Sequence, residues 1–367
     1  MPEPHAPSGW EFAEGDEIAA ERTVLRRLGG GSDFDVYLVW DEGRLTMMVA
    51  KLLRPHLVED PDALRHLRRE AEALERLAHP VVLRSFDAVF DGPHPHLLLE
   101  HLEGWTLRRV ITRGGPLPLE QLLPLTLNVA AALHHLSREG WVHLDVKPDN
   151  IVMGLPPRLI DLSIARPLED AARLRSSLGT DAYMAPEQCD PGHHATPVGS
   201  PADIWGLGAT LHHAIAGEVP FERPRNARDA DDPRVRFPQL HADPRPLPRR
   251  TPPELVGLVA AAMHPDPLQR PTAAELAVKL EPLVDSLPRR MILGRRGTQS
   301  LGHVKASGGR SSLPRFSCQP SLFFSRLTQT AEPNLYSSAL MPSRREPEGK
   351  RSILSDTSHS HRASDLQ

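Results

Sequence analysis

Acidic, basic and amide side chains gather in the short stretch from His143 to Asn150. Within it Asp145 offers a carboxylate, Lys147 an ammonium group and Asn150 an amide, and Asp161 follows 18 residues after His143. Both Asn150 and Asp161 are oxygen donors, which a hard divalent cation requires. A turn whose Asp and Asn side chains cap their own backbone is the structural alternative, and the wider pattern decides between the two.

Further parts of the pattern lie on both sides of this stretch. Three glycines at 29–31, then Lys51 and Glu70, precede it, and Ala185-Pro186-Glu187 begins 24 residues after Asp161. Each match is weak alone, but all of them in this order and at these distances are very hard to obtain by chance. Over about residues 21–285 the chain therefore resembles the Hanks-type, eukaryotic-like serine/threonine protein kinases of bacteria.

The resemblance implies an α+β fold of two lobes, a small β-rich N-lobe and a larger helical C-lobe, with ATP held between them. It implies transfer of the ATP γ-phosphate to serine or threonine hydroxyls of proteins, with Mg²⁺ or Mn²⁺ as the metal. Lysine at 147, followed by Pro148, resembles Ser/Thr kinases rather than tyrosine kinases. The expected setting is bacterial intracellular signalling, and the expected partners are ATP and protein substrates.

Four residues carry the chemistry that the resemblance implies. Asp145 matches the catalytic aspartate that orients the acceptor hydroxyl and accepts its proton, and Lys147 would steady the γ-phosphate as charge develops. Lys51 matches the strand lysine that contacts the α- and β-phosphates, and Glu70 matches the helix carboxylate that pairs with it. Taken alone, Lys51 reads as a solvated strand-edge lysine and Glu70 as part of a solvated helix face.

The nucleotide and metal sites follow from the same resemblance. Gly29 and Gly31 match the loop over the phosphates, where backbone amides reach phosphate oxygens because no side chain intervenes. Asn150 and Asp161 match the two metal ligands, and Leu99 is the residue expected to gate the back of the pocket. The remaining residues expected around the nucleotide are Val36, Val49, Lys51, Glu100, Leu102 and Val152.

Other matches are expected to support the site rather than to take part in the chemistry. Thr180 matches a residue that bridges the catalytic aspartate and lysine in Ser/Thr kinases. Glu187 and Arg270 match a buried ion pair beneath the peptide-binding segment. Asp203 matches the helix aspartate that anchors the catalytic loop.

Four positions depart from the family pattern. Phe34 stands where a third loop glycine is usual, and Val49 replaces a smaller alanine in the adenine pocket. Leu144 replaces the arginine that normally receives an activation-loop phosphate, so activity is not expected to depend on phosphorylation through that contact. Ser163 replaces the glycine after Asp161-Leu162 and is expected to restrict the backbone there.

Two alternatives to an active protein kinase remain open from the sequence. A pseudokinase, a nucleotide-binding or scaffolding module without turnover, is motivated by the departures at Phe34, Leu144 and Ser163. A small-molecule phosphotransferase of kinase-like fold is the other. The threonine at 180 and the Glu187–Arg270 match count against it.

Periodic hydrophobicity predicts the elements that must position these residues. Strand-like, β-branched runs dominate before Gly104 and helical periodicity dominates after it, which favours two segregated parts. Gly140 and Gly217 follow two of the periodic segments and read as C-terminal caps. Strands are expected within 24–25, 36–39, 47–52 and 97–99, and helices over 62–77, 119–139, 202–216, 254–263 and 273–283.

Charge and composition divide the chain into a body and a tail. Residues 286–367 hold 13 Lys/Arg against 5 Asp/Glu, which leaves 30 against 42 for residues 1–285. Ser, Arg, Pro and Gly dominate the tail without periodicity, which is typical of disorder. We expect a leader at 1–20, an N-lobe at 21–104, a C-lobe at 105–285 and a basic, disordered tail at 286–367 that docks a partner or serves as a linker.

Compartment and partners are bounded by a few further observations. Cys189 and Cys318 are the two cysteines, too few for a disulfide framework or a zinc site, which favours a reducing compartment. No apolar run of about 18 residues occurs, and the residues before Gly15 lack a signal-peptide pattern. We therefore expect a cytoplasmic protein without membrane insertion and, since the tail charge is not interleaved with aromatics, without a nucleic-acid role.

Overall fold

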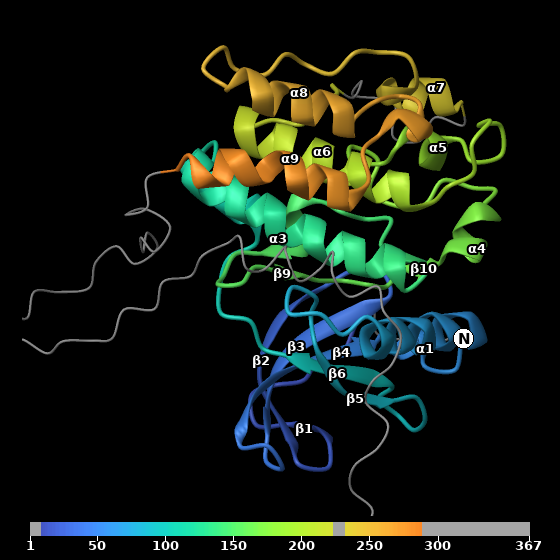
Figure 1. Ribbon diagram of the computed structural model, residues 1–367. Helices are drawn as coiled ribbons and strands as arrows, with labels where there is room; N and C mark the ends of the chain where they lie inside the picture. The colour runs from blue at the N-terminus through green and yellow to red at the C-terminus, as the bar shows by residue number, and fades with distance from the viewer. Residues whose placement is uncertain (1–8, 223–231, 288–367) are drawn as a thin grey trace, which may run out of the picture. The chain divides into compact units, whose positions relative to one another are not determined.

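The computed structural model describes residues 9–222 and 232–287. The N-terminal part is built on a six-stranded antiparallel sheet with the strand order β1-β2-β3-β4-β6-β5 (Figure 1). Its strands are β1 (Glu17–Ala19), β2 (Arg22–Gly30), β3 (Phe34–Asp41), β4 (Thr46–Leu53), β5 (Ser85–Val89) and β6 (His96–Glu100).

The sheet uses its two faces differently. Tyr37 and Val39 of β3 are buried in one hydrophobic cluster together with Ala50 of β4. Side chains alternate along a strand, so Val36 and Lys51, which are paired across β3 and β4, belong to the opposite face. The face that is free of this core therefore carries the lysine expected at the phosphates.

One long helix, α1 (Pro61–Arg76), packs against β5 and β6. Asp60 caps it by accepting two hydrogen bonds from main-chain N–H groups of the first turn. Leu67 and Leu74 are buried on its inner side, and between them Glu70 is only 1% exposed. A carboxylate buried this deeply requires a cationic partner, which β4 supplies.

Helices dominate the second part of the described chain. In Figure 1, α3 lies between α9 and the region of the sheet, and it packs against α9 and α6. α6 is buried nearly all round, which explains its almost continuous apolar sequence. Gly208 on α6 has no room for a side chain, since a Cβ would meet Ala262 Cβ at 2.9 Å. The helices are α2 (Leu107–Gly114), α3 (Leu119–Arg138), α4 (Leu168–Ala172), α5 (Pro186–Cys189), α6 (Ser200–Ala216), α7 (Pro233–Arg236), α8 (Pro253–Ala262) and α9 (Ala273–Asp285).

Short elements complete this part. Two small sheets pair β7 with β10 and β8 with β9, and four 3₁₀ turns lie between the larger elements. None of the helices that the structure describes combines the length and hydropathy needed to cross a bilayer. The short elements are β7 (Trp141–Val142), β8 (Ile151–Val152), β9 (Arg158–Leu159), β10 (Arg166–Pro167), η1 (Pro55–Leu57), η2 (Pro148–Asn150), η3 (Pro238–Leu240) and η4 (Pro267–Gln269).

The expected architecture of a β-rich part followed by a helical part is confirmed. Every expected helix is present with ends that agree within two residues, and each expected strand is present in the large sheet. The sheet ends at Glu100 and the next helix begins at Leu107, around the expected change at Gly104. The short elements β1, β5 and α2 were not expected. The predictions made for the tail at 286–367 fall almost wholly on residues 288–367, outside the described chain.

Part of the expected leader at 1–20 lies on the sheet. β1 pairs with β2, and Trp10 and Phe12 pack against the hydrophobic cluster of the sheet. The main-chain N–H of Trp10 donates to the buried carboxylate of Asp35 at 2.9 Å, and its indole Nε1 donates to the Leu53 carbonyl at 2.7 Å. Tyr37 Oη donates to the Trp10 carbonyl at 2.5 Å. The ordered sheet therefore begins before the boundary expected at residue 21.

Two stacked histidines connect the segment after α1 to helix α3. The rings of His79 and His135 lie 5.3 Å apart at 24°. His79 Nδ1 accepts a hydrogen bond from the Val81 N–H, and His135 Nε2 is buried without a partner among the described residues. Burial and the neighbouring His135 lower the pKa of His79 from 6.5 to about 4. His79 therefore enters the contact as a neutral imidazole at neutral pH.

This pair is expected to make the fold sensitive to acid. The unfolded chain takes up a proton at His79 near pH 6.5, whereas the folded chain does so only near pH 4. The free energy of unfolding should therefore fall as the pH falls through this interval. In His79→Asn, which keeps an acceptor for the Val81 N–H, the fall measured by urea denaturation should be smaller. The exposed His56→Gln is the control, and equal slopes in all three proteins would contradict the prediction.

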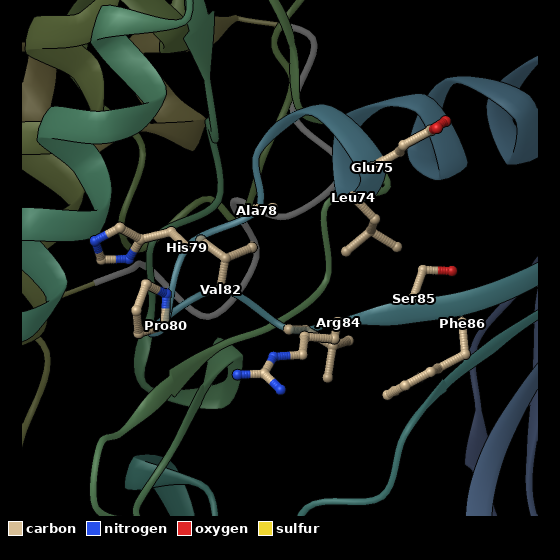
Figure 2. Close-up of a pocket in the computed structure, with 10 residues that line it drawn as sticks. Leu74, Glu75, Ala78, His79, Pro80, Val82, Arg84, Ser85 and Phe86 are labelled. Carbon is tan, nitrogen blue, oxygen red and sulfur yellow. The ribbon is translucent and has the colours of Figure 1, made fainter. Parts of the chain in front are cut away.

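A cavity of ≈ 470 Å³ opens beside the C-terminal end of α1. Figure 2 shows Leu74, Val82 and Phe86 around it, with His79 and Pro80 at one side. None of the residues expected to carry chemistry lines this cavity. The candidate site therefore has to be built from the contacts of the predicted residues themselves.

Candidate active site

Lys51 is the centre of an ionic contact between the sheet, α1 and the segment after β9. Its Nζ lies 2.8 and 2.9 Å from the two carboxylate oxygens of Glu70. It also lies 3.1 Å from Oδ1 of Asp161. The structure therefore brings together three residues that are separated by up to 110 positions and that the sequence marked out for the phosphates and the metal.

The electrostatics of this contact keep Lys51 and Asp161 ionised. Burial lowers the pKa of Lys51, but the carboxylates of Glu70 and Asp161 outweigh it, so the pKa is raised above its usual value. Burial raises the pKa of Asp161, but Lys51 and the Ser163 hydroxyl outweigh it, so this pKa is lowered. The site thus presents a fixed ammonium group and a fixed carboxylate side by side at neutral pH.

Removing the Glu70 charge is expected to weaken the use of ATP. In Glu70→Gln the ammonium group of Lys51 keeps only Asp161 as an ionic partner and is drawn toward it. A hydrogen bond to a charged group contributes about 1.5–3 kcal/mol, so kcat/KM for ATP should fall about 10- to 100-fold. Steady-state kinetics at varied ATP measures this, with the exposed Glu72→Gln on the same helix as the control. Equal kcat/KM in both variants would contradict the prediction.

A second cluster forms around the stretch from His143 to Asn150. Lys147 Nζ lies 2.6 Å from Asp145 Oδ2 and 2.6 Å from Thr180 Oγ1. Asn150 Nδ2 donates to the Asp145 carbonyl oxygen at 2.9 Å and to its Oδ2 at 3.0 Å. Thr180 was expected to bridge Asp145 and Lys147; it contacts Lys147 directly, and Lys147 in turn contacts Asp145.

One oxygen of Asp145 is left without a partner. Oδ2 is held by Lys147 and Asn150, whereas Oδ1 is buried and accepts no hydrogen bond from any residue that the structure describes. A buried acceptor of this kind is costly unless a donor arrives. A hydroxyl group of a substrate is a donor that would satisfy it.

Asp203 on α6 holds the backbone of the stretch from His143 to Asn150. The main-chain N–H groups of His143 and Leu144 donate to the two carboxylate oxygens of Asp203 at 2.8 and 2.7 Å. Leu144 and Asp161 both have φ of +66°, a left-handed conformation that disfavours side chains. Such strain persists only where the surrounding contacts over-determine it, as at functional sites.

The residues expected to hold a metal offer a small set of oxygen donors. Asn150 turns its Nδ2 toward Asp145, so its side-chain oxygen Oδ1 remains available as a ligand. Asp161 offers a carboxylate. Within residues 9–222 and 232–287, no group of three or more His, Cys, Asp or Glu is arranged for a metal. One or two protein oxygens completed by phosphates and water is the usual set for Mg²⁺, so these donors fit that ion.

The residues expected around the nucleotide lie along one side of the sheet. Gly29 is paired with Val36 at the end of β2 and β3, and Val49 is paired with Leu99 across β4 and β6. Val36, Val49, Glu100 and Leu102 are partly exposed, Gly31 is exposed, and Val152 on β8 is 9% exposed. The core therefore does not enclose these residues completely, apart from Val152.

The side chain and the main-chain N–H of Glu100 already have partners and are not free to bind a nucleotide. Its side chain accepts from Arg158 Nε at 3.1 Å and from the Arg84 N–H at 3.0 Å. Its own N–H donates to the Arg84 carbonyl at 3.0 Å. The Glu100 carbonyl, rather than its side chain, is thus the group left for an adenine edge.

Two of the departures from the family pattern make contacts that the sequence did not reveal. The Phe34 ring lies over the Lys51 ammonium group, with 4.6 Å between Nζ and the ring centroid. Ser163 gives a hydroxyl hydrogen bond to Asp161. Both residues therefore support the charged groups of the site. Neither replaces one of them.

At Leu144, where the family pattern has a phosphate-binding arginine, the structure has an uncharged hydrogen bond from Gln188 to the main chain. Gln188 Nε2 donates to the carbonyl oxygens of Leu144 and Leu178 at 2.9 and 3.1 Å. The amide of Gln239 likewise donates to the carbonyls of Asp181 and Met184 at 2.7 and 3.1 Å. Gln188 thus holds the segment around Thr180 next to the catalytic stretch, and Gln239 holds the same segment to η3. Sequence reasoning missed both because their partners are backbone atoms.

The predicted pair of Glu187 and Arg270 is present and fully enclosed. Arg270 Nη1 and Nη2 donate to the two Glu187 carboxylate oxygens at 2.6 and 2.8 Å, and both side chains are 0% exposed. Arg270 also donates to the carbonyls of His264, Pro201 and Pro265. The pair fixes α5 to the segment before α9.

Comparisons with known proteins agree with this geometry. Residues 22–279 match the family model described as "Protein kinase domain". The chain is 30% identical over 268 residues to serine/threonine-protein kinase PknB of Mycolicibacterium smegmatis, covering 69% of this chain and 41% of that protein. It is 32% identical over 260 residues to the probable serine/threonine-protein kinase PkwA of Thermomonospora curvata, covering 70% and 33%.

A third relative matches a smaller share of the chain. Serine/threonine-protein kinase PrkC of Bacillus subtilis is 31% identical over 212 residues, 57% of this chain and 32% of that protein. The matched region thus spans less than half the length of each of these relatives. The family model covers most of the chain, and the charged residues of the family pattern lie together in the structure. The chain belongs to the family of Hanks-type bacterial serine/threonine protein kinases.

Proposed function

We propose that this chain is an active kinase that transfers the γ-phosphate of ATP to serine or threonine hydroxyls of protein substrates in bacterial intracellular signalling. The observation that carries the proposal is Asp145, whose Oδ1 is buried and has no partner among the described residues while Oδ2 is fixed by Lys147 and Asn150. A carboxylate held in this way is ready to receive one hydroxyl donor.

The contacts suggest a role for each residue. Asp145 Oδ1 accepts a hydrogen bond from the acceptor hydroxyl and then takes the hydroxyl proton. The hydroxyl oxygen attacks the γ-phosphorus, and the bond between the γ-phosphorus and the ADP oxygen breaks, so that ADP leaves. Lys147, held by Asp145 and Thr180, lies ready to stabilise the charge that develops on the transferred phosphoryl group. Lys51, fixed by Glu70, does the same for the non-transferred phosphates.

The metal and the nucleotide complete the site. Asn150 and Asp161 would hold Mg²⁺, or Mn²⁺ in its place, and the ion would neutralise charge on the phosphates. Gly29 and Gly31 would cover the phosphates with backbone amides. The adenine would lie among Val36, Val49, Leu102 and Val152 and meet the Glu100 carbonyl.

The setting follows from the substrate and from the cysteine that the structure describes. ATP is an intracellular substrate, and Cys189 is a buried, free thiol, as is usual for proteins of reducing compartments. We therefore place the enzyme in the cytoplasm. Its N-lobe and C-lobe would correspond to the parts on either side of Gly104.

The proposal is tested by incubating the full chain with labelled ATP, Mg²⁺ and a general protein acceptor, and by repeating the reaction with Mn²⁺. Label on serine or threonine, and not on tyrosine, is the expected result after acid hydrolysis of the products. A folded chain that gains thermal stability from ATP but transfers no label to any protein, itself included, would overturn it in favour of a pseudokinase. Transfer only to small molecules would overturn it in favour of a small-molecule phosphotransferase.

A further inference from the structure

Helix α2 carries an unusual concentration of positive charge. Its eight residues include Arg108, Arg109 and Arg113 and no acidic residue. The body of the chain, residues 1–285, is acidic, with 42 Asp/Glu against 30 Lys/Arg. Together with Trp105, which lies just before the helix, these arginines form a surface that we call the α2 arginine surface.

Trp105 holds two of the arginines side by side. The Arg109 and Arg113 guanidinium carbons lie 4.6 and 5.5 Å from the centroid of its ring, and the indole is 46% exposed. Like charges four residues apart on a helix repel each other, and the aromatic ring offsets part of that repulsion. Stacking uses the flat face of a guanidinium group and leaves its N–H groups free at the edge to bind carboxylates.

In the described part of the chain, these two arginines have no carboxylate partner. Neither Arg109 nor Arg113 takes part in a salt bridge with any residue that the structure describes, and both are exposed. Most other exposed arginines of the N-terminal part, such as Arg44, Arg65 and Arg68, lie within 4 Å of an Asp. The α2 arginine surface therefore has unsatisfied capacity for an anionic partner.

The surface is continuous with the catalytic stretch. α2 packs against η2, which contains Asn150. Arg108 lies 3.9 Å from Asp149, one residue before this predicted metal ligand, and both side chains are close to half exposed. Arg108 also contacts His213, whose Nδ1 is 2.7 Å from Tyr183 Oη in the predicted peptide-binding segment. A chain that offers a hydroxyl to Asp145 would pass close to these side chains.

We propose that the α2 arginine surface binds acidic residues that flank the phosphorylated serine or threonine, so that acidic segments of proteins are the preferred substrates. Arg109 and Arg113 bind Asp or Glu side chains of the substrate, and Trp105 holds the two guanidinium groups in place. Arg108 lies 3.9 Å from Asp149 and so reduces the attraction of that carboxylate for basic residues of a substrate. This inference rests on the proposed kinase activity and adds its substrate class.

The test compares three acceptor peptides that share one serine and differ only in flanks rich in Asp/Glu, Gln/Ala or Arg. For the wild-type full chain, KM for the acidic peptide should be about tenfold lower than KM for the neutral one. In Arg109→Glu/Arg113→Glu this advantage should disappear or reverse, while kcat and KM for the neutral peptide stay within about twofold. Arg249→Glu/Arg250→Glu, with the same change in net charge at two exposed arginines before α8, should keep the preference.

Binding is measured separately so that the two proposals fail in different ways. A fluorescent acidic peptide with Ala in place of the acceptor Ser should bind the wild type and lose affinity in the α2 variant, whether or not any phosphate is transferred. Binding without turnover would overturn the kinase proposal, and with it the substrate class, while showing that the α2 arginine surface binds acidic segments. Turnover without a preference for acidic flanks, or a preference unchanged in the α2 variant, would overturn this one. So would a single-stranded oligonucleotide that displaces the peptide and binds more tightly.

Discussion

Replacing Asp145 by asparagine is expected to lower phosphoryl transfer to a protein acceptor about 1000-fold, within the range of about 10² to 10⁴ for loss of a general base. Oδ1 of Asp145 is buried and has no partner in residues 9–222 and 232–287, and the other oxygen is held by Lys147 and Asn150. An asparagine side chain fills the same space but cannot take the proton from a hydroxyl. Transfer in a single turnover at saturating ATP measures the effect.

The matched control lies in the same stretch of chain. Asp149 is close to half exposed and pairs only loosely with Arg108, at 3.9 Å, so Asp149→Asn should change transfer to a neutral acceptor peptide less than about threefold. The Asp145→Asn protein should still gain thermal stability from ATP, because Lys51 and Glu70 are untouched. Transfer by this variant at a rate near that of the wild type would show that Asp145 is not the base.

Replacing Arg270 by alanine is expected to lower the free energy of unfolding by about 3–5 kcal/mol. The change leaves the Glu187 carboxylate at 0% exposure without its cation, and it also removes donors from the carbonyls of His264 and Pro201. A charge left unpaired in the interior is far more costly than the loss of a surface contact. Urea denaturation followed by circular dichroism measures the change.

Two further variants separate the cause from a general sensitivity to arginine loss. Arg173 is exposed and lies 3.8 Å from Glu169 and 3.6 Å from Asp170, so Arg173→Ala should cost less than about 1 kcal/mol. The double variant Arg270→Met/Glu187→Leu should regain much of the stability, because no buried charge remains. A loss below 1 kcal/mol in Arg270→Ala would contradict the expectation.

The parts of the site that could be predicted are those whose partners are side chains in recognisable motifs. Lys51 and Glu70 meet as expected, as do Glu187 and Arg270, and Asp203 binds the backbone of the catalytic stretch. Their residue types and order along the chain carry the information. Helix and strand positions were likewise predictable, because the long elements carry an apolar face or, as in α6, are buried nearly all round.

The parts that could not be predicted depend on backbone partners or on packing between distant segments. The Gln188 amide binds two carbonyl oxygens, which any residue provides, so its sequence position gives no signal. Phe34 reads as a missing glycine, and its position over Lys51 depends on how the loop closes. Trp10 looks like part of a leader because its partners, Asp35 and Leu53, lie far along the chain and face it only in the folded sheet.

The hydrogen bonds from Gln188 to the carbonyls of Leu144 and Leu178 determine how the catalytic stretch is attached to the segment around Thr180. An amide bound to two carbonyls has no net charge, so neither a phosphatase nor a change in ionic strength undoes it. Leu144 has no charged side chain that could bind a phosphate. The position of the catalytic stretch at this contact therefore does not depend on whether a nearby residue is phosphorylated. We therefore expect this contact to hold the catalytic stretch against the segment around Thr180 in the same way at low and at high ionic strength.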